Sequence, residues 1–346
     1  MSLSTSQIAD LIEAARDDLG ELKWTDLSAE LQEYIAMPQI LRKEKVKFES
    51  GTGIQRTLQL DHSGAARHVG FFEEDQVNTN DVIGKTSVGW CHTTTNYAIE
   101  EKEIAMNKGA TRILDLVKLR RNDAMMSLAA LMEDTFWSVG PAASTDLETP
   151  FGVFYYIVKH TTGTSATTGG FNGATASGHS ACAGLTDARW RNWTAKWVYA
   201  TRDDLIDKMQ RCYAYTHFRS PLPNPAPSYA RGRDRYVLYM NYSTKAALER
   251  AAEDRNENIG KDLGFYQDQL VFRGNPMVWV PKLDEDTSNP IVFINWSVLY
   301  PVFLADLYLK EEQQKSPRQH TTHVTHVDLT HNLLCVNRRR LGVISQ

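Results

Sequence analysis

Apolar positions between residues 105 and 137 recur at the spacing of one helix face. They lie three, four or seven residues apart and form a single stripe, made of Ile113, Val117, Ala124, Leu128 and Leu131. No proline interrupts the segment, and Gly140 and Pro141 follow it as a stop signal. At about 1.5 Å per residue such a helix is roughly 45–50 Å long. The pattern predicts a long spine helix that needs packing partners along its whole length.

The segment before this helix has the pattern of extended chain with little hydrophobic content. Residues 46–49 and 54–60 alternate between apolar and polar, Gly51 and Gly53 mark a turn between them, and residues 90–96 form a threonine-rich strand candidate. A two-stranded excursion of this kind is marginally stable in isolation. We therefore expect it to pack on its own body or on a neighbouring molecule. Residues 1–44 are polar apart from a short helical pattern at 8–19, which predicts an N-terminal arm.

The segment after the helix has the pattern of a compact α+β body. Strands are predicted at residues 151–158, 236–240, 277–280, 291–295 and 324–336. A capping-box-like start at Thr201 predicts one helix, and residues 243–258 predict another, charged helix. Residues 161–184 are dominated by Thr, Ser, Gly and Ala, so they cannot build a core and are predicted to form a surface loop.

Composition and charge narrow the class of protein. A chain of 346 residues can bury a sizeable core, and by its length it holds two or three domains. The formal net charge of -4 argues against tight binding to nucleic acid. No apolar run approaches the length of a membrane span, and the N-terminus lacks a signal-peptide pattern. The four cysteines form no CxxC pair, so we expect reduced thiols.

Histidines near the C-terminus are the main candidates for metal chemistry, and a metal-dependent enzyme that uses His320, His323 and His331 is the alternative function. A zinc site requires its ligands to converge. The surrounding residues favour a strand, on which His323 and His331 share one face while His326 points to the other. The spacing therefore separates the group, and the simpler interpretation is polar residues on a strand.

Three further motifs each have an ordinary structural explanation beside a functional one. Residues 178–182 resemble a G-x-S-x-G nucleophile elbow, but Cys182 replaces the last glycine and no buried strand precedes them. Trp190, Trp193 and Trp197 are interpreted as core or interface residues rather than a base-stacking platform. The basic run 338–340 either contacts phosphate or a neighbour's carboxylates, or is a solvated end. With no phosphate-binding GxxxxGK[ST] motif either, the sequence predicts no enzyme and no catalytic, cofactor-binding or metal-binding residue.

The order of these elements resembles the major capsid proteins of tailed bacteriophages, which have the HK97-like fold. Residues 239–250 and 272–281 resemble strand and helix segments of the family's axial (A) domain, and residues 328–340 resemble the closing segment of its peripheral (P) domain. The resemblance implies an α+β fold with an N-terminal arm (1–44), an extended two-stranded E-loop (45–98), a P domain that includes the spine helix (99–190 and 313–346) and an A domain (191–312). The loop 161–184 has no counterpart in this pattern.

The resemblance also implies a structural role. Copies of the chain are expected to form hexamers and pentamers of an icosahedral shell that encloses double-stranded DNA without sequence-specific binding. The arm and the E-loop would lie on neighbouring subunits, and residues 118–123 of the spine helix would face solvent, DNA or a neighbour. Expected partners are a separate scaffolding protein, a portal and, as an open option, a decoration protein. The expected location is the virion, assembled in the host cytoplasm, with no membrane contact. A sheath or other virion ring protein is the further alternative.

Overall fold

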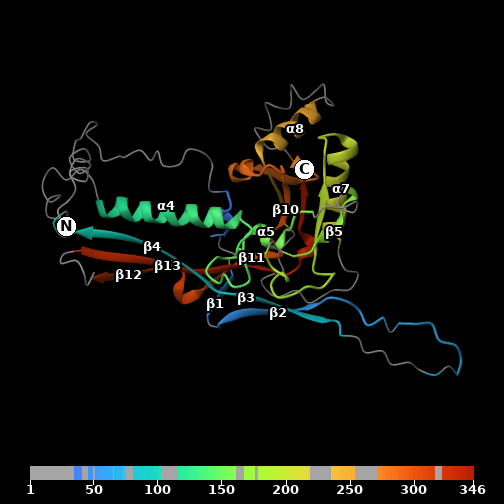
Figure 1. Ribbon diagram of the computed structural model, residues 1–346, viewed down its shortest axis with the longest axis horizontal. Helices are drawn as coiled ribbons and strands as arrows, with labels where there is room; N and C mark the ends of the chain where they lie inside the picture. Colours follow the sequence, from blue (N-terminus) through green and yellow to red (C-terminus); the bar gives the residue numbers. More distant parts are fainter. Residues whose placement is uncertain are drawn as a thin grey trace.

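The structure is a computed structural model that describes residues 35–40, 46–49, 51–64, 66–72, 74, 81–100, 102, 116–160, 167–175, 178–218, 235–253, 271–315 and 322–346. Two large sheets form the body, and a separate two-stranded hairpin leaves it (Figure 1). No helix in the described residues is long and apolar enough to cross a membrane.

The first sheet is built around one long strand. Its five strands are β1 (Val46–Phe48), β4 (Cys91–Glu100), β11 (Leu299–Leu304), β12 (Lys310–Lys315) and β13 (Thr322–Cys335). The central strand β13 pairs antiparallel with β4, β12 and β11, and β1 adds to β11 in parallel. β13 confirms the strand predicted at 324–336. The alternating pattern of residues 46–49 predicted that β1 is part of the two-stranded excursion. It instead belongs to this sheet.

Helix α4 (Leu116–Phe136) lies along this sheet and beside β4 (Figure 1). It confirms the second half of the predicted spine helix; residues 105–115 and the Val117 side chain lie outside the described part. The buried seam is made of Ala124, Leu128, Met132 and Phe136. Leu131, predicted on the buried stripe, is instead 52% exposed. Steps of four residues follow one ridge of the helix surface, and packing along that ridge leaves position 131 on the outer side.

The polar middle of α4 was predicted to face solvent, DNA or a neighbour, but two of its arginines bind the subunit's own sheet. Arg120 Nη1 donates to the carbonyl of Ala98 on β4 at 2.8 Å. Arg121 Nε donates to Glu311 Oε1 on β12 at 2.9 Å. Both arginines therefore join the polar middle of the helix to strands of the same subunit.

The second sheet has seven strands in the order β5-β6-β14-β10-β7-β9-β8. Their bounds are β5 (Gly170–Gly173), β6 (Asn192–Lys196), β14 (Gly342–Ser345), β10 (Ile291–Asn295), β7 (Tyr236–Met240), β9 (Asn275–Trp279) and β8 (Val271–Phe272). β7, β9 and β10 confirm predicted strands. Every residue of β10 is buried, as expected for a strand covered on both faces.

Helices cover the two faces of this sheet. Met209 and Cys212 of α7 (Asp207–Thr216) pack on Leu238 and Phe293, and Leu248 of α8 (Tyr242–Glu253) joins the same cluster. Both helices confirm predictions, although α7 is preceded by a π-helical turn at Arg202–Ile206 and residues 254–258 of the charged helix lie outside the described part. On the opposite face the end of α4 and the short helix α5 (Val153–Tyr156) meet Tyr239 and Val292. One continuous core therefore joins the two sheets.

The strand predicted at residues 151–158 is wrong. This apolar segment forms α5, a single helical turn whose four side chains are all buried. The turn lies so close to the end of α4 that a Cβ at Gly152 would lie 2.1 Å from the carbonyl oxygen of Ser138. Tertiary packing, rather than the β propensity of Val153, Phe154, Tyr155 and Tyr156, decides the conformation here.

The expected domain boundaries cut across the two sheets. β4, expected partly in the E-loop, and β11, expected in the A domain, both belong to the five-stranded sheet. β14, expected in the P domain, lies in the middle of the seven-stranded sheet between β6 and β10. The chain therefore ends inside the second sheet after crossing over from β13.

Candidate assembly surface

The hairpin of β2 (Gly53–Gln59) and β3 (Ile83–Gly89) extends away from the body, and the chain beyond it reaches further still (Figure 1). The two strands pair antiparallel from Gly53 opposite Gly89 to Gln59 opposite Ile83. Burial is concentrated near the root: Ile54 and Val88 pack on Tyr300, Val302 and Leu334 of the five-stranded sheet, and Thr86 is also buried. The distal half therefore has no apolar core of its own in the described residues.

Two aromatic side chains lie fully in solvent on the far part of this excursion. Phe71 is 98% exposed and Phe72 is 106% exposed, and Val69 beside them is also exposed. Exposed single apolar residues are ordinary, but adjacent aromatic rings on an extended arm are typical of a surface that is covered by another protein. These residues form the candidate assembly surface.

The described part of the N-terminal arm lies on its own subunit. Ala36 and Ile40, at either end of the short helix α2 (Met37–Ile40), are buried against α4. The buried carboxylate of Glu133 accepts hydrogen bonds from the backbone N–H of Ala36 at 2.9 and 3.0 Å, and from Trp137 Nε1 at 2.7 Å. For residues 35–40, the expectation that the arm lies on a neighbour is therefore wrong; residues 1–34 lie outside the described part.

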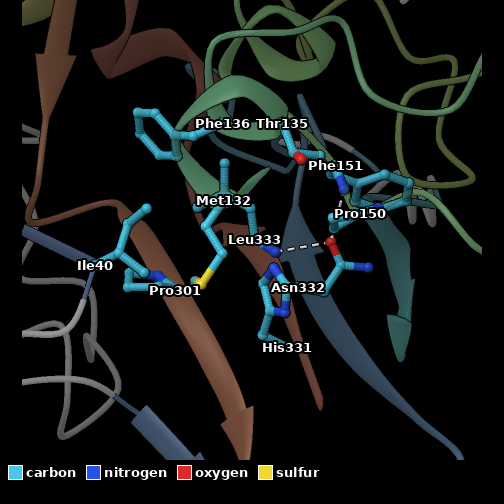
Figure 2. A pocket seen from close by; sticks show the side chains of 10 residues that line it. All are labelled: Ile40, Met132, Thr135, Phe136, Pro150, Phe151, Pro301, His331, Asn332 and Leu333. Carbon is cyan, nitrogen blue, oxygen red and sulfur yellow. Dashed lines mark hydrogen bonds between the residues drawn. The ribbon is translucent and has the colours of Figure 1, made fainter. Parts of the chain in front are cut away.

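A small pocket of about 20 Å³ lies where the arm, α4 and β13 meet (Figure 2). This volume is room for about one water molecule. Its lining is mostly apolar, from Ile40, Met132, Phe136 and Leu333. Such a pocket is too small for a substrate.

His331, Asn332 and Thr135 carry the polar side chains that line this pocket. The Asn332 side chain is satisfied: Oδ1 accepts from the backbone N–H groups of Phe151 and Leu333, and Nδ2 donates to the carbonyl of Gly89 (Figure 2). His331 Nδ1 is buried and has no hydrogen-bond partner among the described residues. Burial lowers the pKa of His331 from 6.5 to about 4, so the ring is neutral at physiological pH.

The histidines predicted as alternative metal ligands are not brought together. His323 and His331 lie eight residues apart on one strand, which corresponds to roughly 26 Å. His323 pairs across the sheet with Ile99, whereas His331 pairs with Cys91 near the other end of β4. His320 lies outside the described residues. Within the described part of the chain, no group of three or more His, Cys, Asp or Glu side chains is placed to hold a metal ion.

The nucleophile-elbow-like segment and the three tryptophans contribute buried side chains to the core. Cys182 is fully buried, and burial raises its pKa to about 11, which leaves the thiol protonated and unreactive. Trp190, Trp193 and Trp197 are all buried, which confirms their interpretation as core residues.

Arg338 fits neither interpretation of the basic run, which were contact with phosphate or a neighbour's carboxylates, and a solvated end. Its side chain is 0% exposed and donates hydrogen bonds to the carbonyls of Tyr156, Gly173, Ala174 and Trp190. Its guanidinium also donates to Asn192 Oδ1. Arg338 therefore joins the segment between β13 and β14 to the surrounding loops.

Sequence reasoning missed β3, β11 and the Glu133 contact with the arm. β3 (Ile83–Gly89) contains two glycines and one lysine, which weaken its strand signal. Glu133 is followed directly by Asp134, and no local feature of the sequence distinguishes the buried carboxylate from the exposed one.

Comparison with known proteins gives similarity in structure alone. No protein-family profile matches the sequence, and no curated protein is significantly similar to it. In contrast, the capsid asymmetric unit of cyanophage A-1(L) superimposes with a TM-score of 0.64 at 14% sequence identity, covering 94% of this chain and 96% of the other.

Two further solved structures give the same result. A chain from Mycobacterium phage Bobi has a TM-score of 0.53 at 8% identity and covers 100% of this chain and 99% of its own. The capsid of a native GTA particle has a TM-score of 0.52 at 9% identity, with 93% and 94% covered. Coverage is nearly complete in both directions, so the similarity concerns the whole architecture and not one shared motif. The chain has the HK97-like fold of tailed-bacteriophage major capsid proteins.

Proposed function

We propose that this chain is the subunit of an icosahedral protein shell, arranged as hexamers and pentamers around packaged double-stranded DNA. The observation that carries the proposal is the hairpin, which leaves the body with Phe71 and Phe72 fully exposed. An arm of this kind is stable when a neighbouring copy covers it. The fold shared with capsid structures supports the same role.

We assign the domains of the proposed shell subunit according to the two sheets and the hairpin. The five-stranded sheet with α4 corresponds to the P domain, the seven-stranded sheet with α7 and α8 to the A domain, and the hairpin to the E-loop. Each subunit of a shell touches several others, so many weak contacts add up to a stable assembly. The net charge of -4 agrees with DNA that is held by enclosure and not by tight contacts.

Expression of the full chain, alone or with a scaffolding protein, tests the proposal. We expect closed particles by electron microscopy and a correspondingly large mass by light scattering. A folded chain that stays monomeric at every concentration and ionic strength would overturn it.

A double variant tests the role of the exposed rings. Phe71→Ser with Phe72→Ser should leave the folded subunit unchanged, because both side chains are exposed. It should weaken each contact made by the hairpin by roughly 1.5–3 kcal/mol per ring and reduce the yield of particles. The matched control, Phe71→Leu with Phe72→Leu, keeps apolar side chains and should retain most assembly. Equal yields from the serine and leucine variants would show that the rings are not part of the interface.

A further inference from the structure

Residues 178–189 comprise the end of the segment 161–184 and the five residues that follow it. They contact the hairpin of their own subunit, and we call them the bracket segment. The backbone N–H of Ser87 on β3 donates to the carbonyl of Ala183 at 3.0 Å. Leu185 lies against Gly84, where a Cβ would be 3.1 Å from Leu185 Cδ1. The bracket segment therefore holds β3 by both a hydrogen bond and an apolar contact.

A second contact lies on the chain just beyond β2. Arg189 Nη2 donates to Asp61 Oδ1 at 3.0 Å, and both side chains are about half exposed. An exposed ion pair contributes little to stability. It lies seven residues beyond Ile54, the buried root of the hairpin, which is roughly 23 Å along an extended strand. Because the ion pair lies so far from the root, it restricts the direction of the hairpin, although it adds little to the stability of the fold.

The bracket segment is itself fixed to the core. The N–H of Ala183 donates to the hydroxyl of Tyr155 at 2.9 Å, and Trp190 Nε1 donates to the carbonyl of Cys182 at 3.1 Å. Cys182 and Leu185 exchange backbone hydrogen bonds across a tight turn, in which Ala183 and Gly184 have φ values of +51° and +79°. Two central residues with positive φ make a stiff turn whose hand matches strand twist.

The hairpin is thus held at its buried root, beside which Ser87 bonds to the bracket segment, and again further out at Gly84 and Asp61. A two-stranded ribbon held only at its root can swing, because Gly51, Gly53 and Gly89 lie at that root and few apolar contacts resist the motion. The contacts beyond the root, at Gly84 and Asp61, restrict this motion.

We propose that the bracket segment is a positioning element that sets the direction in which the hairpin meets a second copy of this chain. This inference rests on the proposed shell function and deepens it, because the direction of the hairpin fixes the angle between neighbouring subunits. It also gives a role to part of the segment 161–184, which the capsid pattern did not explain. Arg189, Ala183 and Gly184 are the residues through which the bracket segment acts.

Distance measurements between two spin labels on the unassembled full chain test the positioning directly. All four native cysteines are buried, so cysteines introduced by His68→Cys on the excursion and Ser144→Cys on the body can be labelled selectively. The parent should give one narrow distance distribution. Arg189→Asp places a like charge opposite Asp61, so the single narrow peak should be lost. The charge swap Asp61→Arg with Arg189→Asp should restore it.

Gly184 provides an independent variant with a matched control. Gly184→Ala strains the turn at φ +79° and should broaden the distribution, whereas Gly184→Asn tolerates this conformation and should broaden it less. Distributions unchanged in both Arg189→Asp and Gly184→Ala would overturn the inference.

Particle images of the same variants complete the test. We expect irregular or open particles from Arg189→Asp and regular ones from the charge swap. A broadened distribution with particles of unchanged size and yield would show that the bracket segment does not act in assembly. If the parent forms no particles, the shell function fails, while the distance distributions still decide whether the bracket holds the hairpin.

Discussion

Glu133, His331 and Arg338 are polar residues inside the core, and the protein accommodates each by a different means. Glu133 receives the backbone N–H of the arm, and Arg338 is surrounded by carbonyl oxygens. His331 stays neutral in an apolar setting, with the ring of Phe303 stacked at 6.2 Å and no other titratable side chain lining its pocket. The first two strengthen contacts between segments distant in sequence, whereas the third makes stability depend on pH.

His331 should destabilise the folded subunit as the pH falls. Its pKa is about 4 when folded and 6.5 in the unfolded chain, so between these values the unfolded state binds more protons. Above pH 6.5 the ring is neutral in both states and His331 does not lower the stability. As the pH falls from 6.5 to about 4, the free energy of unfolding decreases progressively, by on the order of 3 kcal/mol in total. Denaturant unfolding at several pH values measures this slope.

A substitution isolates this histidine from the carboxylates that titrate in the same range. His331→Gln should remove its share of the pH dependence, while the exposed control His62→Gln should keep the slope of the parent. Identical slopes for all three proteins would contradict the assignment.

At the scale of elements, α4 shows how a correct helix prediction can misplace one face. Its buried seam runs through Ala124, Leu128, Met132 and Phe136, four residues apart, and Arg120 and Arg121 continue the contact with the sheet beyond the apolar seam. The predicted stripe shared Ala124 and Leu128 but included Leu131. Neighbouring leucines on this helix therefore differ sharply in environment.

Two aspartate variants on α4 test this seam. Leu128 is 3% exposed, so Leu128→Asp buries an unpaired charge and should cost about 4 kcal/mol or more of stability. Leu131→Asp is the matched control on the outer side and should change stability by within about 0.5 kcal/mol. Thermal unfolding of soluble subunits measures both. Equal destabilisation would mean that Leu131 also faces a core.

At the scale of the whole molecule, the body is self-sufficient and the excursion is not. Buried residues from α4, α5 and both sheets form one cluster, whereas the buried residues of the hairpin are Ile54, Thr86 and Val88, all in the half nearer its root. β4, by contrast, pairs with β13 along all of its ten residues, so it belongs to the body although it follows directly on the hairpin. The boundary between body and excursion therefore lies near Gly89.

Shortening the excursion separates folding from assembly. Gln59 and Ile83 are direct cross-strand partners, so a two-residue Asn-Gly turn can replace residues 60–82 and keep the root of the hairpin. The shortened chain should unfold at nearly the same temperature as the parent but should form no closed particles. Calorimetry and electron microscopy measure the two properties, and normal particles from this variant would refute an intermolecular role for the excursion.

The sequence by itself determined the elements whose signals are local. The spacing of apolar residues and the stop at Gly140 and Pro141 define the end of α4. Continuous apolar runs define β7 and β10, and the alternating pattern of β2 with its low hydrophobic content predicts an extended excursion. Each signal depends on periodicity within one segment, so it needs no knowledge of the partner.

Only the tertiary structure decided which segments meet. It turns residues 153–156 into a helical turn, moves β14 into the seven-stranded sheet and separates His323 from His331 by the length of a strand. It also buries Arg338 among carbonyl oxygens, although three consecutive arginines favour a solvated surface. The physical reason is that pairing and burial depend on contacts between distant segments, and local propensities are too weak to specify those contacts.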